Sequence, residues 1–345
     1  MRLTGPIRLL LRGLLFLPLL FVPTLLDGIL ALSGTEARHL ADYEVLATRL
    51  RSGQTIRIGW NLRALKLFAT SKPPSSSILV LGSSRALAVS QAWFPSQSLW
   101  NASVTAGTLE DSAALLQTAL NAGRIPSTVI LEVSPALSRD PVPGTSRALD
   151  VARDRALARY GVHVPAPSSW FFGLNISWSD ALRRFISTTS ETSGAPSPST
   201  VEYTVTPDGA VLLFDLDAGG ADARRVSGEL LQLPPEQLEA RSQSVPTPEY
   251  ARLFRQMLDD LHSRGIRVII LTPPIHPFAW DFFHRRGGYD DQWLRRELTP
   301  RGIPIVGTFS PAGSHVTEAD FYDAFHPRPA VLRRLLTEAG IIPAQ

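Results

Sequence analysis

Two serines follow a short apolar run, at a place where a hydroxyl could act as a nucleophile. The sequence ILVLGSSRAL covers residues 78–87, and its apolar part predicts a buried strand that ends at Gly82. Ser83 and Ser84 come next, before a stretch compatible with a helix. A serine in such a strand-to-helix turn exposes its hydroxyl at the carboxyl edge of a sheet, beside amides that can stabilise an anion. The alternative is that a serine here only caps the helix.

A carboxylate and an imidazole lie close together near the other end of the chain. In YDAFHPRP, residues 322–329, Asp323 and His326 are separated by two residues. In a tight loop or single turn this spacing lets the carboxylate orient the imidazole, which could then act as general base for a serine from another strand end. The pair alone is a common feature. Its joint occurrence with the Gly-Ser-Ser turn is what indicates a site.

A third segment, LWNASVTAGTLEDS at residues 99–112, could contribute hydrogen-bond donors. Asn101 ends an apolar stretch, and Gly107 precedes an amphipathic helix, so that its amide could donate to an oxyanion. An ordinary loop, with a glycine for backbone freedom, is the alternative. His276 follows another predicted strand and either lines the site or serves as scaffold.

The composition narrows the possible chemistry. The 345 residues include no cysteine, which excludes disulfides, thiolate catalysis and cysteine-ligated metals. The histidines lack metal-ligand spacing and no glycine-rich phosphate loop follows a strand, so we expect neither a metal nor a cofactor. A formal net charge of +3 is too small to indicate a nucleic-acid partner.

Short apolar runs that alternate with helical patterns predict an α/β fold, with a mainly parallel sheet flanked by helices. The predicted strands are 78–81, 128–133, 266–271 and 303–306, and the predicted helices are 109–122, 248–264 and 330–339. Residues 35–72 predict two more helices, the first of them a candidate stalk, and residues 71–77 predict a linker.

Residues 140–246 interrupt this alternation and predict an insertion between core strands. The segment is rich in Pro, Ser, Gly and Arg, and it contains one predicted hairpin that turns at Pro207-Asp208-Gly209. We expect the insertion to form a lid or a cap facing the substrate. Its aromatic residues either stack on a sugar or form a small hydrophobic cluster under a long loop. They are Trp170, Phe171, Phe172 and Trp178.

Residues 13–32 form an apolar stretch of about one bilayer thickness if helical. Arginines precede it and acidic residues follow, so the positive-inside rule places the amino end in the cytoplasm and the rest outside. We expect a retained single-pass anchor in the inner or plasma membrane, with a cleaved signal peptide as the alternative. The predicted organisation is an anchor or signal at 1–33, a helical stalk and linker at 34–76, and a periplasmic or extracellular catalytic domain at 77–345.

The order of these motifs resembles the sequence blocks of the SGNH/GDSL hydrolases. The corresponding segments are Gly82-Ser83-Ser84, residues 101–107, residues 131–135 and Asp323-Ala324-Phe325-His326. The resemblance implies a three-layer α/β fold with Ser84 as nucleophile, His326 as base and Asp323 as its partner. It also implies that Gly107 and the Ser84 backbone supply oxyanion donors, with Asn101 beside them.

The third block departs from the family pattern. The family carries Gly-x-Asn-Asp there, and its Asn donates to the oxyanion, whereas this chain has Glu132-Val133-Ser134-Pro135. Ser134 and Arg85 are the candidates to replace that donor. The Ser-Pro strand end, the Gly-Ser-Ser turn and the amino-terminal apolar stretch are similar to the D-alanyl-lipoteichoic-acid transfer proteins and the alginate-type O-acetyltransferases.

That likeness implies transfer of an acyl group, acetyl in the first instance, to a cell-envelope or secreted polysaccharide through an acyl-Ser84 intermediate. The implied partners are the polysaccharide acceptor and a multi-spanning membrane acyltransferase that supplies the donor. Two alternatives stay open. One is an esterase or deacetylase that uses water as acceptor, and the other is a catalytically idle scaffold subunit of a polysaccharide-export complex.

Overall fold

The chain divides into two compact units. The computed structural model describes residues 35–58, 62–72, 76–134, 147–161, 203–212, 221–233 and 235–344. One unit comprises residues 1–43 and 165–200, and only the beginning of helix α2 (Thr35–Arg51) is described in it. The other unit comprises residues 44–164 and 201–345. The predicted anchor at 13–32 and the aromatics at 170–178 lie outside the described residues, within which no helix is long and apolar enough to cross a membrane.

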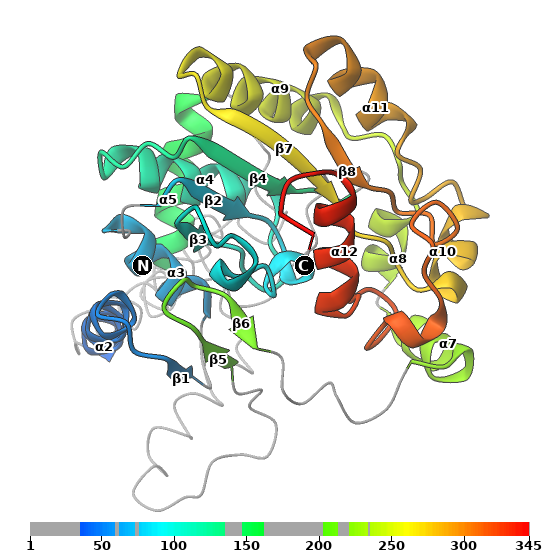
Figure 1. Ribbon diagram of the computed structural model, residues 1–345, viewed down its shortest axis with the longest axis horizontal. Helices are drawn as coiled ribbons and strands as arrows, with labels where there is room; N and C mark the ends of the chain where they lie inside the picture. The colour runs from blue at the N-terminus through cyan, green and yellow to red at the C-terminus, as the bar shows by residue number, and fades with distance from the viewer. Residues whose placement is uncertain are drawn as a thin grey trace, which may run out of the picture. The chain divides into compact units, whose positions relative to one another are not determined.

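A parallel sheet of five strands organises the second unit (Figure 1). The strand order is β3-β2-β4-β7-β8. The strand bounds are β2 Ile78–Leu81, β3 Leu99–Asn101, β4 Thr128–Glu132, β7 Arg267–Thr272 and β8 Ile305–Gly307. The predicted strands at 78–81, 128–133, 266–271 and 303–306 are confirmed. Strand β3 was predicted only as an apolar stretch, and it forms one edge of the sheet.

Helices join the strands and cover the sheet (Figure 1). Their bounds are α3 Leu62–Ser71, α4 Leu109–Asn121, α5 Arg147–Arg159, α7 Ala223–Leu231, α8 Pro235–Arg241, α9 Pro248–Ser263, α10 Pro277–His284, α11 Gln292–Leu298 and α12 Pro329–Glu338. Single 3-10 turns occupy Ser84–Ala86, Gln91–Trp93, Thr299–Arg301 and Glu318–Asp320. The helices predicted at 109–122, 248–264 and 330–339 are confirmed to within one residue at each end.

Both faces of the sheet are buried, as the uninterrupted apolar runs predict. Ile78, Val80 and Ile130 belong to one core cluster together with residues of α10 and α12. Because side chains alternate along a strand, Leu79 and Val129 face the other side, where α4 contacts β2 and α9 contacts β7. The parallel arrangement brings the carboxyl ends of all five strands to one edge.

A second, antiparallel sheet has the order β1-β5-β6. Its strands are β1 Ile56–Ile58, β5 Tyr203–Val205 and β6 Val211–Leu212. The predicted hairpin is therefore confirmed, with its turn at residues 206–209. Its pairing with β1, which lies between the two predicted helices α2 and α3, was not predicted. Helices α5, α7 and α8 also fall within the predicted insertion, and α5 packs against α3 and α4.

Candidate active site

Ser84, His326 and Asp323 form one hydrogen-bonded chain, although 242 residues separate the serine from the histidine. The distance from Ser84 Oγ to His326 Nε2 is 2.7 Å. On the other side of the ring, His326 Nδ1 lies 2.7 Å from Asp323 Oδ2 and 2.9 Å from Oδ1. The expectation that these residues share a site is confirmed, and their geometry is that of a nucleophile, a general base and an orienting acid.

The two adjacent serines have different surroundings. Ser83 is extended, with φ −96° and ψ −170°, and its hydroxyl accepts a long hydrogen bond of 3.4 Å from the Arg85 amide, so it caps the 3-10 turn. Ser84 is the first residue of that turn, and its hydroxyl meets the imidazole. The alternative of a helix-capping serine thus applies to Ser83 and not to Ser84, whose hydroxyl meets the imidazole.

The loop before α12 holds Asp323 against the imidazole. Asp323 Oδ1 accepts hydrogen bonds of 2.8 Å from the amides of both Phe325 and His326. The amide of Tyr322 donates to the His326 carbonyl at 3.0 Å, which closes the loop. Two residues between acid and base therefore suffice, because the backbone folds around the carboxylate.

Asp323 stays ionised in this setting. Burial by itself would raise its pKa, but hydrogen bonds from His326 and from two amides, together with the charge of the imidazolium, outweigh burial and bring the pKa below its usual value. An ionised carboxylate fixes the proton on Nδ1 and leaves Nε2 to accept the proton of Ser84. The side chains of His326 and Asp323 are 25% and 20% exposed, so solvent reaches the pair.

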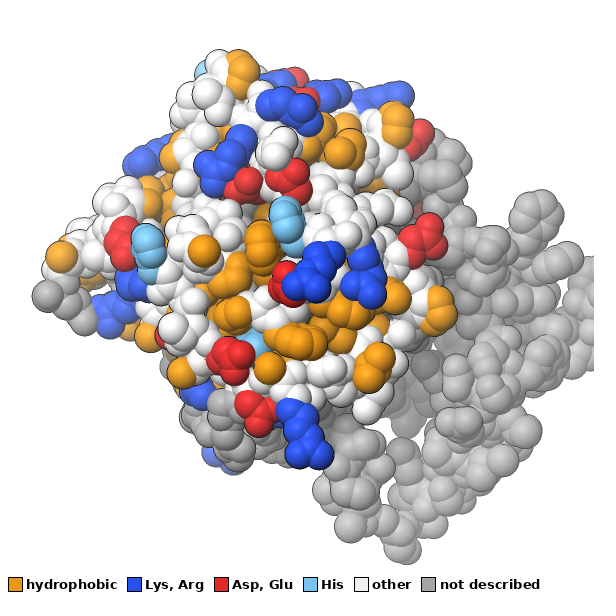
Figure 2. Space-filling view, turned by 90° about the vertical axis from the view of Figure 1, so that its right-hand side faces the viewer, with side chains coloured by type: hydrophobic (Ala, Val, Ile, Leu, Met, Phe, Trp, Pro, Cys, Tyr) orange, Lys and Arg blue, Asp and Glu red, His pale blue; other side chains and the backbone are white. Residues whose placement is uncertain are grey.

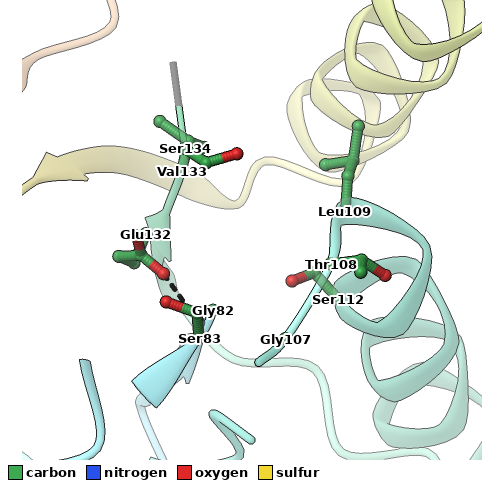
Figure 3. A pocket seen from close by; sticks show the side chains of 9 residues that line it. All are labelled: Gly82, Ser83, Gly107, Thr108, Leu109, Ser112, Glu132, Val133 and Ser134. Atoms are coloured by element: carbon green, nitrogen blue, oxygen red, sulfur yellow. Dashed lines mark hydrogen bonds between the residues drawn. The ribbon is translucent and has the colours of Figure 1, made fainter. Parts of the chain in front are cut away.

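A small pocket adjoins the serine turn, with a volume of about 20 Å³ that suits one water molecule or a group of similar size. It is formed by the end of β2, the start of α4 and the end of β4 (Figure 3). The lining residues are Gly82, Ser83, Gly107, Thr108, Leu109, Ser112, Glu132, Val133 and Ser134. The structure therefore places Ser134 and Gly107 together beside the turn, as the sequence suggested.

The amide of Gly107 is engaged elsewhere. It donates a 3.2 Å hydrogen bond to the Val104 carbonyl, so the expected oxyanion donor points into its own turn in this structure. A side chain at this position would collide with the Gly82 carbonyl and approach Ser83 Cα at 3.1 Å. Glycine is therefore needed for the close packing of this loop on the serine turn.

Asn101 does not face the site, which corrects its assignment as a substrate or oxyanion residue. It is fully buried, and its Nδ2 donates to the carbonyls of Ala86, Leu87 and Val89 at 2.9, 3.1 and 2.8 Å. Both N–H groups of the Asn101 amide therefore donate to carbonyls of the backbone segment that follows the Ser84 turn. Asn101 fixes the path of that segment from the neighbouring strand end.

Arg85 uses part of its guanidinium to hold the scaffold, whereas its Nη1 is buried and has no hydrogen-bond partner among the described residues. Its guanidinium is buried and forms an ion pair with Glu132, and Nη2 donates to the Val133 carbonyl at 3.0 Å. Glu132 Oε2 accepts a 2.6 Å hydrogen bond from the Ser83 amide, which Figure 3 shows as a dashed line. In the sequence, Glu132 stands out only as a departure from a family pattern. A carboxylate at the end of a buried strand was itself a signal, because a buried charge needs a partner.

The amide of Ser84 is the most direct candidate for an oxyanion donor. It is the first amide of the 3-10 turn, a position without an acceptor inside the turn. Within the described part of the chain it makes no hydrogen bond. An amide on the attacking residue itself lies next to the carbonyl that the residue attacks.

His276 is scaffold, one of the two alternatives for this residue. The imidazole is completely buried, and its Nε2 lies 3.0 Å from the Ala221 carbonyl while its Nδ1 accepts from the Phe278 amide at 3.2 Å. Burial lowers its pKa, so the ring is neutral. The His276 amide donates to the Ala324 carbonyl at 3.2 Å, which supports the loop that carries Asp323 and His326.

The described residues contain no cluster of three or more His, Asp or Glu side chains that could hold a metal ion. Comparison with known proteins finds no family model that matches the chain and no curated protein that matches it.

Proposed function

We propose that this protein is an acyltransferase of the SGNH type, which moves an acyl group, most simply acetyl, through an ester on Ser84. The observation that carries the proposal is the unbroken chain from Ser84 through His326 to Asp323, with hydrogen bonds of 2.7 Å on both sides of the imidazole. The carboxyl edge of a parallel sheet, where Ser84 and the small pocket lie, also supports it.

The chemistry follows from these positions. His326 Nε2 takes the proton of Ser84 Oγ as the oxygen attacks the acyl carbonyl of the donor, and Asp323 stabilises the imidazolium. The Ser84 amide donates to the oxyanion. Collapse of the tetrahedral intermediate breaks the donor ester bond, and His326 protonates the leaving oxygen, which leaves acyl-Ser84. An acceptor hydroxyl then gives its proton to His326, attacks the acyl-Ser84 carbonyl and releases Ser84, which recovers its proton.

The acceptor in this proposal is a hydroxyl of a cell-envelope or secreted polysaccharide, and a multi-spanning membrane acyltransferase supplies the donor. The apolar stretch at 13–32 supports a location at the membrane. Figure 2 shows hydrophobic side chains gathered on the side that carries α7, α8 and α10 in Figure 1, with basic and acidic side chains among them. Phe325, which precedes His326, is half-buried against α8 and α10, with the Arg241 guanidinium 4.2 Å from its ring and the Phe283 ring centroid 6.0 Å away.

Hydrolysis is the second candidate, and one observation favours it. The His326 side chain is 25% exposed, so water can reach the position of the acceptor in the absence of a sugar. An esterase or deacetylase would use the same acyl-Ser84 intermediate. The two functions differ only in whether the acceptor site excludes water.

The deciding experiment measures both fates of the acyl group. The purified protein is given a chromogenic acetyl ester with and without a panel of neutral and acidic oligosaccharides, and acylated sugar is read by mass spectrometry. We expect slow ester hydrolysis in buffer and faster ester loss with an acceptor, with the acyl group found on the sugar. Fast hydrolysis without sugar acylation would identify an esterase. Neither reaction, even with the membrane partner present, would favour the idle scaffold.

A further inference from the structure

One carboxylate joins the residues on either side of Ser84. Glu132 Oε2 accepts the Ser83 amide at 2.6 Å, and Oε1 receives Nη2 of Arg85 in an ion pair. The side chains of Arg85 and Glu132 are 8% and 2% exposed, so water cannot replace either contact at little cost. The position of the residue between them is therefore set from both ends.

The Glu132 carboxylate is held in a fixed position by the elements around it. Glu132 is the last residue of β4, which lies between β2 and β7 in the sheet. Gly82 has φ +149°, and a Cβ there would come within 2.7 Å of Glu132 Oε2. The side chain thus fits against a position that only glycine leaves open. We call the two contacts of Glu132, with the Ser83 amide and with Arg85, the clamp. Because the strand and the glycine hold the Glu132 side chain in place, the clamp fixes the serine turn relative to the sheet.

We propose that Glu132 is a positioning residue for Ser84, acting through Ser83 and Arg85; this inference rests on the proposed acyl transfer. It aims the Ser84 hydroxyl at His326 and leaves the Ser84 amide unbonded and fixed in direction. A donor held in this way needs no reorganisation when the oxyanion forms. Glu132 organises the backbone donor of Ser84 and supplies no oxyanion donor itself.

The substitution Glu132→Gln tests this role with almost no change in size. The glutamine side chain keeps one acceptor oxygen and carries a donor NH₂ group in place of the other oxygen. Either the contact with the Ser83 amide or the contact with Arg85 is therefore lost. We expect kcat for an acetyl ester, and the rate of fluorophosphonate labelling of Ser84, to fall by roughly 10–100-fold, since small misplacements of reacting groups cost that much. KM should change by less than about threefold, because ground-state binding does not use the clamp.

Asp260→Asn is the matched control. Asp260 accepts hydrogen bonds from Gln117 and Arg264 near the end of α9, which leads into the amino end of β7, whereas Ser84 follows the carboxyl end of β2. This variant should lose thermal stability and keep kcat. A second variant, Arg85→Met with Glu132→Gln, removes both buried charges and keeps an acceptor for the Ser83 amide. Its labelling rate should lie between those of Glu132→Gln and the unchanged protein. Equal rates for the unchanged protein and Glu132→Gln would overturn the proposal.

Crystal structures of the unchanged protein and of Glu132→Gln separate this inference from the proposed function. In the variant, we expect the distance from Ser84 Oγ to His326 Nε2 to exceed hydrogen-bond reach, about 3.2 Å. A distance that stays near 2.7 Å contradicts the clamp, whether or not the protein turns over any ester. A displaced Ser84 in a protein without acyl chemistry keeps the clamp and rejects the proposed function.

Discussion

Asp323 shows how much of the site depends on single atoms. Its two oxygens accept hydrogen bonds from two amides and from the imidazole. Replacing one of these oxygens by nitrogen should therefore change the tautomer of His326 and leave the fold unchanged. The residue adds little bulk to the core and makes its contacts within three positions of its own. Its contribution should therefore be visible in the rate rather than in stability.

We expect Asp323→Asn to lower kcat by roughly 10³–10⁴-fold, because the amide stabilises the wrong tautomer of His326 and cannot support an imidazolium. Ester turnover measured over pH 6–9 checks this. Thermal unfolding should change little, since Oδ1 can still accept both amides. A variant with more than about a tenth of the original kcat would contradict the role of Asp323.

Lys66 is a buried titratable side chain outside the triad. It is fully buried on α3, and its ammonium group donates to the carbonyls of Asn101 and Gly209. Burial lowers its pKa to about 7, although Asp208 opposes this shift. The unfolded chain thus holds one more proton than the folded chain between about pH 7 and the ordinary pKa of 10.5. Stability should rise with pH across this window.

The free energy of unfolding should therefore increase from pH 7 to pH 9 by about 2–3 kcal/mol more in the unchanged protein than in Lys66→Met. Urea denaturation at the two pH values measures this difference. Lys72→Met is the control, because Lys72 is the other lysine of the chain and is exposed. The same pH dependence in all three proteins would show that Lys66 keeps an ordinary pKa.

The hairpin β5–β6 is the element that links the insertion to the serine turn. Its Asp208 carbonyl accepts the Asn101 amide at 2.7 Å, and the Val211 amide donates to the Leu87 carbonyl at 2.9 Å. The Asp208 carboxylate also accepts the amide of Gln91. The tip of the hairpin therefore packs on the segment that follows Ser84, and on the strand end that carries Asn101.

Gly209→Ala should detach this tip. Gly209 has φ +82°, and a Cβ there would collide with the Asn101 carbonyl. Gly123→Ala is a matched control, because φ is +72° and nothing lies within 4 Å of a Cβ. We expect the control to lose about 1–2 kcal/mol from backbone strain alone, and Gly209→Ala to lose clearly more, with a fall in kcat. Chemical denaturation and ester assays measure both. Equal losses of stability in the two variants would show that the hairpin tip accommodates a Cβ at residue 209 without detaching.

At the scale of single elements, the sequence predicts the strands and helices that a local pattern of apolar residues determines. The predicted strands β2, β4, β7 and β8 and helices α4, α9 and α12 carry strong apolar patterns, and their bounds agree with the structure to within two residues. Strands β1 and β3 have only three residues each and exist because a partner strand pairs with them. The triad could be predicted because its residue types are characteristic. The roles of Asn101 and Glu132 could not, since their partners lie 12–15 and 47–49 residues away.

At the scale of the whole molecule, we propose that the site works outside the cytoplasm. The arginines before residues 13–32 predict a cytoplasmic amino end. A reporter that is active only outside the cytoplasm should therefore function when fused after residue 345. Activity of a cytoplasm-only reporter at that position would contradict the proposed topology. A substitution of the three arginines by glutamate is the control, and it should weaken or reverse the result.

The most direct test of the account asks which side chain becomes covalently modified. The protein is treated with a fluorophosphonate probe and mapped by peptide mass spectrometry, beside the variants Ser83→Ala, Ser84→Ala and His326→Ala. We expect the probe on Ser84 in the unchanged protein and in Ser83→Ala. Labelling should be absent in Ser84→Ala and at least about 100-fold slower in His326→Ala. A probe found on Ser83, or labelling that persists without Ser84, would contradict the assignment of Ser84 as the nucleophile.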